Sequence, residues 1–98
     1  PGLFENFTNF NSFKRLSLTF NLLKSLESDT FGNLSDLEYL WLKSNQINTI
    51  DYRCFSNLIN LIELSLTKNN LTYLDPFTFQ NLKKLETLSL SKNQLKHI

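Results

Sequence analysis

Residues 37–58 read Leu-Glu-Tyr-Leu-Trp-Leu-Lys-Ser-Asn-Gln-Ile-Asn-Thr-Ile-Asp-Tyr-Arg-Cys-Phe-Ser-Asn-Leu, and this stretch decides the fold. Its apolar residues form a fixed series that has one asparagine, Asn45, in the middle and ends in a phenylalanine and a leucine. The same series returns every 24 residues along the chain. From residue 13 onward, all 26 positions that the series assigns to an apolar residue carry one. In a chain that is 41% apolar, chance gives this agreement with a frequency on the order of 10^-10, so the chain consists of tandem repeats.

The 24-residue period organises the 98 residues as one domain. No insertion interrupts the period, so we expect no loop that projects from the array. The predicted division is a partial N-terminal repeat over 1–12, full repeats over 13–36, 37–60 and 61–84, and a truncated repeat over 85–98.

The string L-x-x-L-x-L-x-x-N-x-L-x-x-L-x-x-x-x-F-x-x-L, as in residues 37–58, resembles the 24-residue class of leucine-rich repeat. The resemblance extends from about Asn6 to Ile98. It implies an α/β solenoid with a curved parallel β-sheet on the concave face and irregular or 3₁₀ segments on the convex face. In this family the class is typical of animal extracellular and cell-surface proteins, among them Toll-like receptors, axon-guidance proteins and matrix proteoglycans.

Each repeat contains a short alternating segment that predicts one strand, with its leucines pointing inward. Each repeat returns the chain to the same edge, so these strands should pair in parallel. The predicted strands are 15–19, 39–43, 63–67 and 87–91.

Two further columns of the repeat have predicted structural roles. An asparagine amide carries both donors and an acceptor, so one placed where the chain turns after a strand can satisfy buried backbone groups. A phenylalanine column should stack as a spine inside the convex side. The expected buried asparagine ladder is Asn21, Asn45, Asn69 and Asn93, and the phenylalanine column is Phe7, Phe31, Phe55 and Phe79.

The outward strand positions vary between repeats, so they carry the functional information. Trp41 is the only tryptophan, it faces solvent by this pattern among serines, and Tyr39 lies two residues away on the same face. Exposed Trp and Tyr near an Arg are typical of interface hot spots. The alternative is that Trp41 lies over its small neighbours and packs only there. The predicted ligand-binding residues on the concave face are Arg15, Tyr39, Trp41, Lys43, Glu63 and Thr67.

Three sequons for N-linked glycosylation begin at Asn6, Asn33 and Asn70. A chain of this composition is expected to contain about two by chance, so their number is not evidence of use. We expect Asn33 and Asn70 to lie at exposed positions.

The single cysteine, Cys54, occupies the repeat position that Thr30 and Thr78 hold in the neighbouring repeats. We expect it to be partly exposed on the convex side. Two interpretations are open: a lone small thiol, or a bridge to another part of a parent chain or to a second chain.

Composition excludes several classes of function. The net charge is +1 with both signs scattered, whereas nucleic-acid binders usually carry a basic stripe, so no nucleic acid is favoured as partner. No apolar run approaches the roughly 18 residues of a membrane span, so a membrane would be contacted only through a part of the parent chain outside this sequence. The sequence offers no converging acid, base and nucleophile, and no metal-ligand spacing or glycine-rich loop. We therefore expect neither catalysis nor a cofactor or metal.

The leading hypothesis is a recognition module of an extracellular or cell-surface receptor or adhesion protein that binds a protein ligand on its concave face. The array lacks the cysteine-rich caps usual in extracellular members, so we expect a piece of a longer ectodomain. The alternative is a structural repeat segment that associates end to end through uncapped ends and has no ligand of its own. A third possibility is an intracellular repeat protein that regulates an enzyme.

Overall fold

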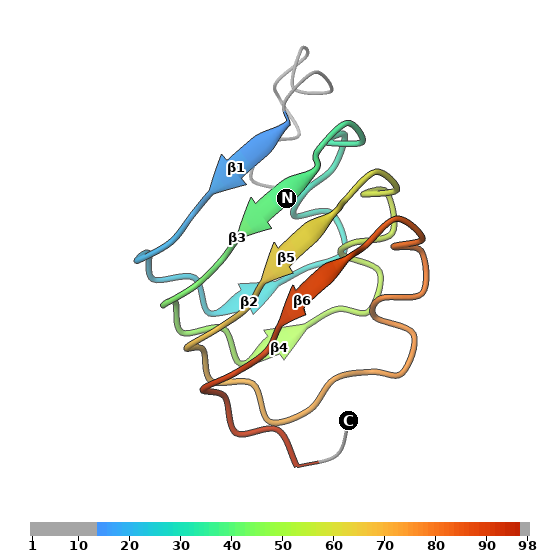
Figure 1. Ribbon diagram of the computed structural model, residues 1–98. Coiled ribbons are helices and arrows are strands. Elements are labelled where there is room, and N and C mark those ends of the chain that lie inside the picture. Colours follow the sequence, from blue (N-terminus) through green and yellow to red (C-terminus); the bar gives the residue numbers. More distant parts are fainter. Residues whose placement is uncertain (1–13, 97–98) are drawn as a thin grey trace.

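The computed structural model describes residues 14–96, which wind into stacked coils (Figure 1). Each coil contributes one strand to a four-stranded parallel sheet whose order is β1-β3-β5-β6. These strands are β1 (Arg15–Ser17), β3 (Tyr39–Trp41), β5 (Glu63–Ser65) and β6 (Thr87–Ser89). The solenoid of parallel strands that the repeat predicts is therefore confirmed.

The register of the sheet is the one that a strict 24-residue period requires. Leu16 pairs with Leu40, Leu40 with Leu64, and Leu64 with Leu88. The inward leucines thus form one column, and the residues on either side of them form outward rows across the strands. Leu40 and Leu64 are fully buried, whereas Leu88, on the last strand, is 37% exposed.

The strands span three residues each, not the five that alternation predicts, although the hydrogen-bond ladder continues past them. Leu42 N–H donates to Ser65 O at 2.9 Å and Ser44 N–H to Thr67 O at 3.0 Å. The ladder ends where a non-glycine residue adopts a left-handed backbone, a conformation that costs roughly 1–2 kcal/mol. The four residues with this conformation are Phe20, Ser44, Lys68 and Lys92, with φ between 57° and 61°.

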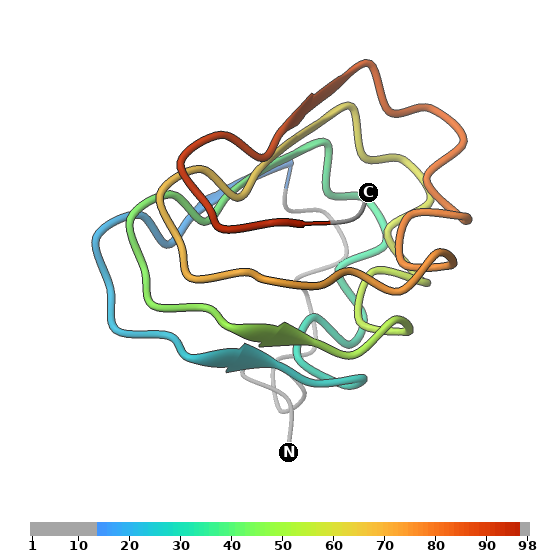
Figure 2. The same ribbon diagram turned by 90° about the horizontal axis from the view of Figure 1, so that it is seen from below.

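A second, two-stranded parallel sheet pairs β2 (Ser25–Leu26) with β4 (Thr49–Ile50), and the sequence pattern did not predict it. Figure 2 shows it on the wall of the coils opposite the four-stranded sheet. Between these walls lies the leucine core. The phenylalanine spine is confirmed: the Phe31 and Phe55 rings stack at 6.0 Å between centroids, and so do those of Phe55 and Phe79. Phe7 lies outside the described residues.

The convex side consists of separate turns. Leu58 N–H donates to Phe55 O and Leu61 N–H to Leu58 O, each closing a single turn. The turns do not run together, so residues 14–96 contain no 3₁₀ segment or other helix, and within that range no helix is available that could cross a membrane. Amides outside the predicted ladder also join neighbouring coils here, as Asn60 does by donating to Ser35 O at 2.9 Å.

The asparagine ladder forms behind the ends of the strands. Asn69 Nδ2 donates to Leu42 O and to Leu66 O, both at 3.0 Å, and Asn69 Oδ1 accepts from Ile47 N–H at 3.1 Å. Each asparagine thus joins its own coil to the preceding one. Asn45 and Asn93 make the corresponding bonds in their coils.

The expectation that all four asparagines are buried is wrong at both ends of the ladder. Asn45 and Asn69 are buried, Asn93 is half-buried and Asn21 is exposed. Asn21 still donates to Leu18 O at 2.8 Å. A central asparagine is covered by a coil on each side, whereas the asparagines at the two ends of the described array are covered less.

Candidate binding surface on the concave face

The outward rows of the four-stranded sheet bring together four of the six predicted ligand-binding residues. Arg15, Tyr39 and Glu63 are direct neighbours in one row, and Trp41 stands two residues beyond Tyr39 on β3. Because successive residues of a strand point to opposite faces, Tyr39 and Trp41 both point outward. Arg15 is exposed, and the other three are half-buried.

Direct contacts join these four side chains, which we call the Trp41 cluster. The Arg15 guanidinium carbon lies 5.1 Å from the centroid of the Tyr39 ring. The Tyr39 and Trp41 rings lie 5.9 Å apart with an interplanar angle of 27°. Trp41 Nε1–H donates to Glu63 Oε2 at 2.6 Å. A cation, two aromatic rings and a carboxylate therefore form one continuous chain across three strands.

The hydrogen bond between Trp41 and Glu63 decides how the indole lies. Trp41 is held between Tyr39 and Glu63, so it does not rest only on the serines of its row. The pattern placed both residues on one face, but the bond runs diagonally between neighbouring rows. The sequence signal that could have revealed it is the pairing of a donor-only indole with a carboxylate on the adjacent strand.

The other two predicted residues lie apart from the cluster. Lys43 is exposed and takes part in none of the ion pairs formed among residues 14–96. Thr67 is half-buried, and its Oγ1 accepts from Ser65 Oγ at 3.4 Å and from Ser91 Oγ at 3.5 Å. They border the cluster on the side where the strands end.

The leucine-rich repeat family model matches residues 11–71 and 59–98, which together include most of the chain. The chain belongs to the leucine-rich repeat family. Among solved structures it resembles Toll, in the glycosylated form of the Toll–Spatzle complex from Drosophila, with a TM-score of 0.77 and 30% identity over 84% of this chain. It also resembles TLR13 in the TLR13–ssRNA13 complex, with a TM-score of 0.82 and 33% identity over 86% of this chain.

These neighbours are much longer than the chain, which covers 12% of the Toll chain and 12% of the TLR13 chain. No curated protein sequence matches it. The comparisons establish a leucine-rich repeat array of the type found in Toll and TLR13.

The sequons that fall in the described residues lie away from the concave strands. Asn33 and Asn70 are both exposed, as expected, in the turn after Phe31 and in the segment after β5 respectively. Asn6 lies outside the described residues.

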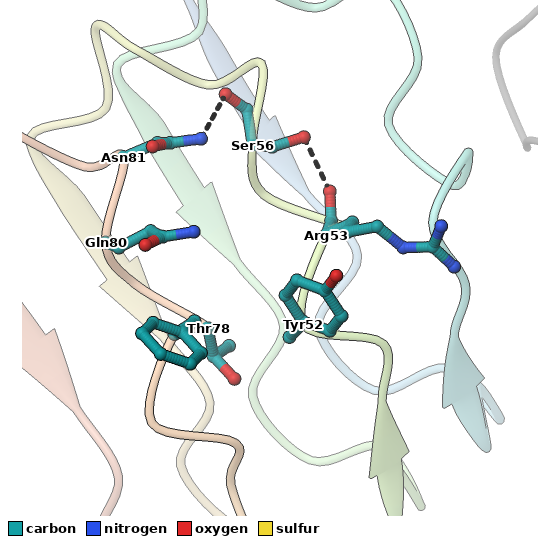
Figure 3. Close-up of a pocket in the computed structure, with 7 residues that line it drawn as sticks. Tyr52, Arg53, Ser56, Thr78, Gln80 and Asn81 are labelled. Atoms are coloured by element: carbon teal, nitrogen blue, oxygen red, sulfur yellow. Dashed lines mark hydrogen bonds between the residues drawn. The ribbon is translucent and has the colours of Figure 1, made fainter.

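A small depression on the convex side, which the sequence pattern did not indicate, has two exposed aromatic residues, Tyr52 and Phe77, in its lining. Figure 3 shows Tyr52 there with Thr78, Gln80 and Asn81. Arg53 contributes to its wall, but Arg53 Nη2 is paired with Asp51 Oδ2 at 3.0 Å. Hydrogen bonding between the two lowers the pKa of Asp51 and raises the pKa of Arg53. The charged group nearest the depression already has its partner, so the depression offers no free charge to a ligand.

The expectation that Cys54 is partly exposed is wrong, because the residue is only 4% exposed. Thr30 and Thr78, its counterparts, are buried too and bond locally: Thr78 Oγ1 donates to Asp75 O at 2.8 Å. Burial raises the pKa of the Cys54 thiol, so the reactive thiolate is disfavoured. A bridge to another chain would require this part of the convex side to open.

We expect the Cys54 thiol of the folded chain to react with Ellman's reagent at neutral pH at least about a hundredfold more slowly than in urea, because reaction requires local opening. Cys54→Thr, which installs the residue of the neighbouring repeats, should keep the free energy of unfolding in urea within about 0.5 kcal/mol of the parent value. Equal reaction rates in the folded and urea-unfolded chain would contradict the buried placement.

Proposed function

We propose that this chain is a non-catalytic recognition module whose concave face binds a protein ligand. The observation that carries the proposal is the Trp41 cluster: the rings and charges of Arg15, Tyr39, Trp41 and Glu63 are joined to one another before any ligand arrives. Lys43 and Thr67 extend the proposed contact surface toward the ends of the strands.

The cluster has the chemistry of an interface hot spot. Trp, Tyr and Arg are enriched at such positions, and the two aromatic side chains bury much area for few rotatable bonds. Stacking restricts the rotamers of Tyr39 and Trp41, and the hydrogen bond to Glu63 fixes the edge of the indole. Binding therefore costs little side-chain entropy at these residues.

A protein ligand fits the charges of this face better than a nucleic acid does. Arg15 and Lys43 are basic and Glu63 is acidic, so the face carries both signs, in a chain whose net charge is +1. The Toll structure is a complex with Spatzle, and the TLR13 structure is a complex with ssRNA13. Likeness to both supports ligand recognition, and the mixed charge favours the protein.

Likeness to Toll and TLR13 also supports an extracellular or cell-surface location, with a role in innate immunity as one form of the proposal. The alternative is an array segment that associates end to end and has no ligand of its own. A segment whose only role is such association would not depend on the Trp41 cluster.

Glycosylation at Asn33 and Asn70 is compatible with this use of the concave face, since both side chains are exposed away from its strands. We expect the chain secreted from animal cells to lose mass on treatment with peptide N-glycosidase F. Asn33→Gln and Asn70→Gln should each remove one glycan. An unchanged mass after enzyme treatment would contradict the expectation that Asn33 and Asn70 carry glycans.

The proposed function is tested by screening the 98-residue chain against a panel of purified extracellular proteins. For the screen, the chain is linked artificially into tetramers, so that avidity strengthens weak binding. Trp41→Ala should weaken binding of a true ligand at least about thirtyfold, because truncating a hot-spot residue costs about 2 kcal/mol or more. Tyr73→Ala is the matched control, since Tyr73 is an aromatic residue that is 63% exposed and lies off the concave strands. A ligand that binds Trp41→Ala and the parent chain equally would overturn the assignment of the concave face.

A further inference from the structure

Among residues 14–96, the Glu63 carboxylate has a neutral hydrogen-bond partner and no cationic partner. Its Oε2 accepts from the indole of Trp41 at 2.6 Å. The ion pairs among residues 14–96 are Lys14 with Glu38 and Arg53 with Asp51, and neither includes Glu63. Within this part of the chain, no cationic side chain is therefore paired with the negative charge of Glu63 on the concave face.

The surroundings of Glu63 leave one side of the carboxylate approachable. Trp41 lies on the side of β3, and the residues beside and beyond Glu63 on β5 and β6 are short: Ser65, Thr87 and Ser89. Arg15 is two strands away, at roughly 10 Å by the usual strand spacing, and its guanidinium lies over Tyr39. Arg15 is thus placed to hold the aromatic pair, not to neutralise Glu63.

Apart from Arg15, the basic side chains of this face lie along its other border. Lys43, Lys68 and Lys92 are all exposed, and they follow the ends of β3, β5 and β6. A cationic group of a ligand would be repelled along that border and attracted at Glu63. The charges therefore favour a bound cation beside Glu63 over one along the lysine border.

We infer that the protein ligand places a basic side chain, arginine or lysine, on Glu63, with its aliphatic stem over Ser65 and Ser89 and its charged head beside the Trp41 ring. This inference rests on the proposed function and names the chemistry of the partner at that site. The indole bond holds the carboxylate in one orientation, and the face of the Trp41 ring attracts cations.

The single tryptophan allows a direct test, because the 98-residue chain gives one indole N–H signal in a proton–nitrogen correlation spectrum. The probe is the tripeptide acetyl-Gly-Arg-Gly-amide, and its control contains citrulline, the neutral isostere of arginine. The arginine peptide should shift the indole signal saturably, with a Kd on the order of 10 mM as expected for one charged contact. The citrulline peptide should shift it at least about tenfold less at the same concentration.

Glu63→Gln keeps an oxygen that accepts from the indole and removes the charge, so its indole signal should stay near the parent position while the response to the arginine peptide is lost. Glu86→Gln removes one negative charge from an exposed neighbouring residue and should retain the full response. Equal shifts with both peptides, no shift with the arginine peptide, or an undiminished response in Glu63→Gln would overturn the inference. The inference would also be overturned if a single-stranded oligouridylate shifted the indole signal at a lower concentration than the arginine peptide does, both in the parent chain and in Glu63→Gln.

Failure of this inference is distinguishable from failure of the proposed function. If the ligand makes no basic contact with Glu63, Trp41→Ala still weakens ligand binding while Glu63→Gln leaves it unchanged. If the concave face is not the binding surface, ligand binding survives both substitutions.

Discussion

The structure depends on how one side-chain amide per coil satisfies the backbone where the chain leaves the sheet. The carbonyl of Leu42 accepts from both Asn45 and Asn69, and the carbonyl of Leu66 accepts from both Asn69 and Asn93. Amides and carbonyls therefore alternate in one continuous chain along the solenoid. Because each asparagine reaches back to the preceding coil, the chain fixes successive coils at the same register and stabilises the left-handed residue before each asparagine.

The concave face follows from that register. With every coil in phase, Arg15, Tyr39 and Glu63 are direct neighbours across three strands, and Trp41 reaches Glu63 on the next strand. The 24-residue period that builds the core thus also sets the positions of the outward residues on the strands, although their identity is not restricted by packing in the core. Recognition of a ligand by the Trp41 cluster, and of a basic side chain by Glu63, would both use a geometry fixed before binding.

The fold could be predicted from the sequence because each column of apolar residues has one structural role. A single 24-residue period fixes the positions of all these columns. The outward rows were predictable for the same reason. The bond from Trp41 to Glu63 was not, because side-chain direction within a row depends on which neighbour offers a partner. The burial of Cys54 was also missed, because threonines at that position suggested exposure, whereas in the folded chain their hydroxyls bond locally beneath the turn. The exposure of Asn21 reflects its place at the end of the described ladder, which periodicity does not encode.

The most direct test of the ladder compares the free energies of unfolding in urea of Asn69→Ala and Asn21→Ala. Asn69→Ala leaves the buried Ile47 N–H without its partner and removes one donor from each of two carbonyls, so we expect a loss of about 2–4 kcal/mol. Asn21 is exposed, and water replaces its bonds, so Asn21→Ala should cost less than about 1 kcal/mol. Equal small losses in the two variants would contradict the account that the amide chain holds the coils in register.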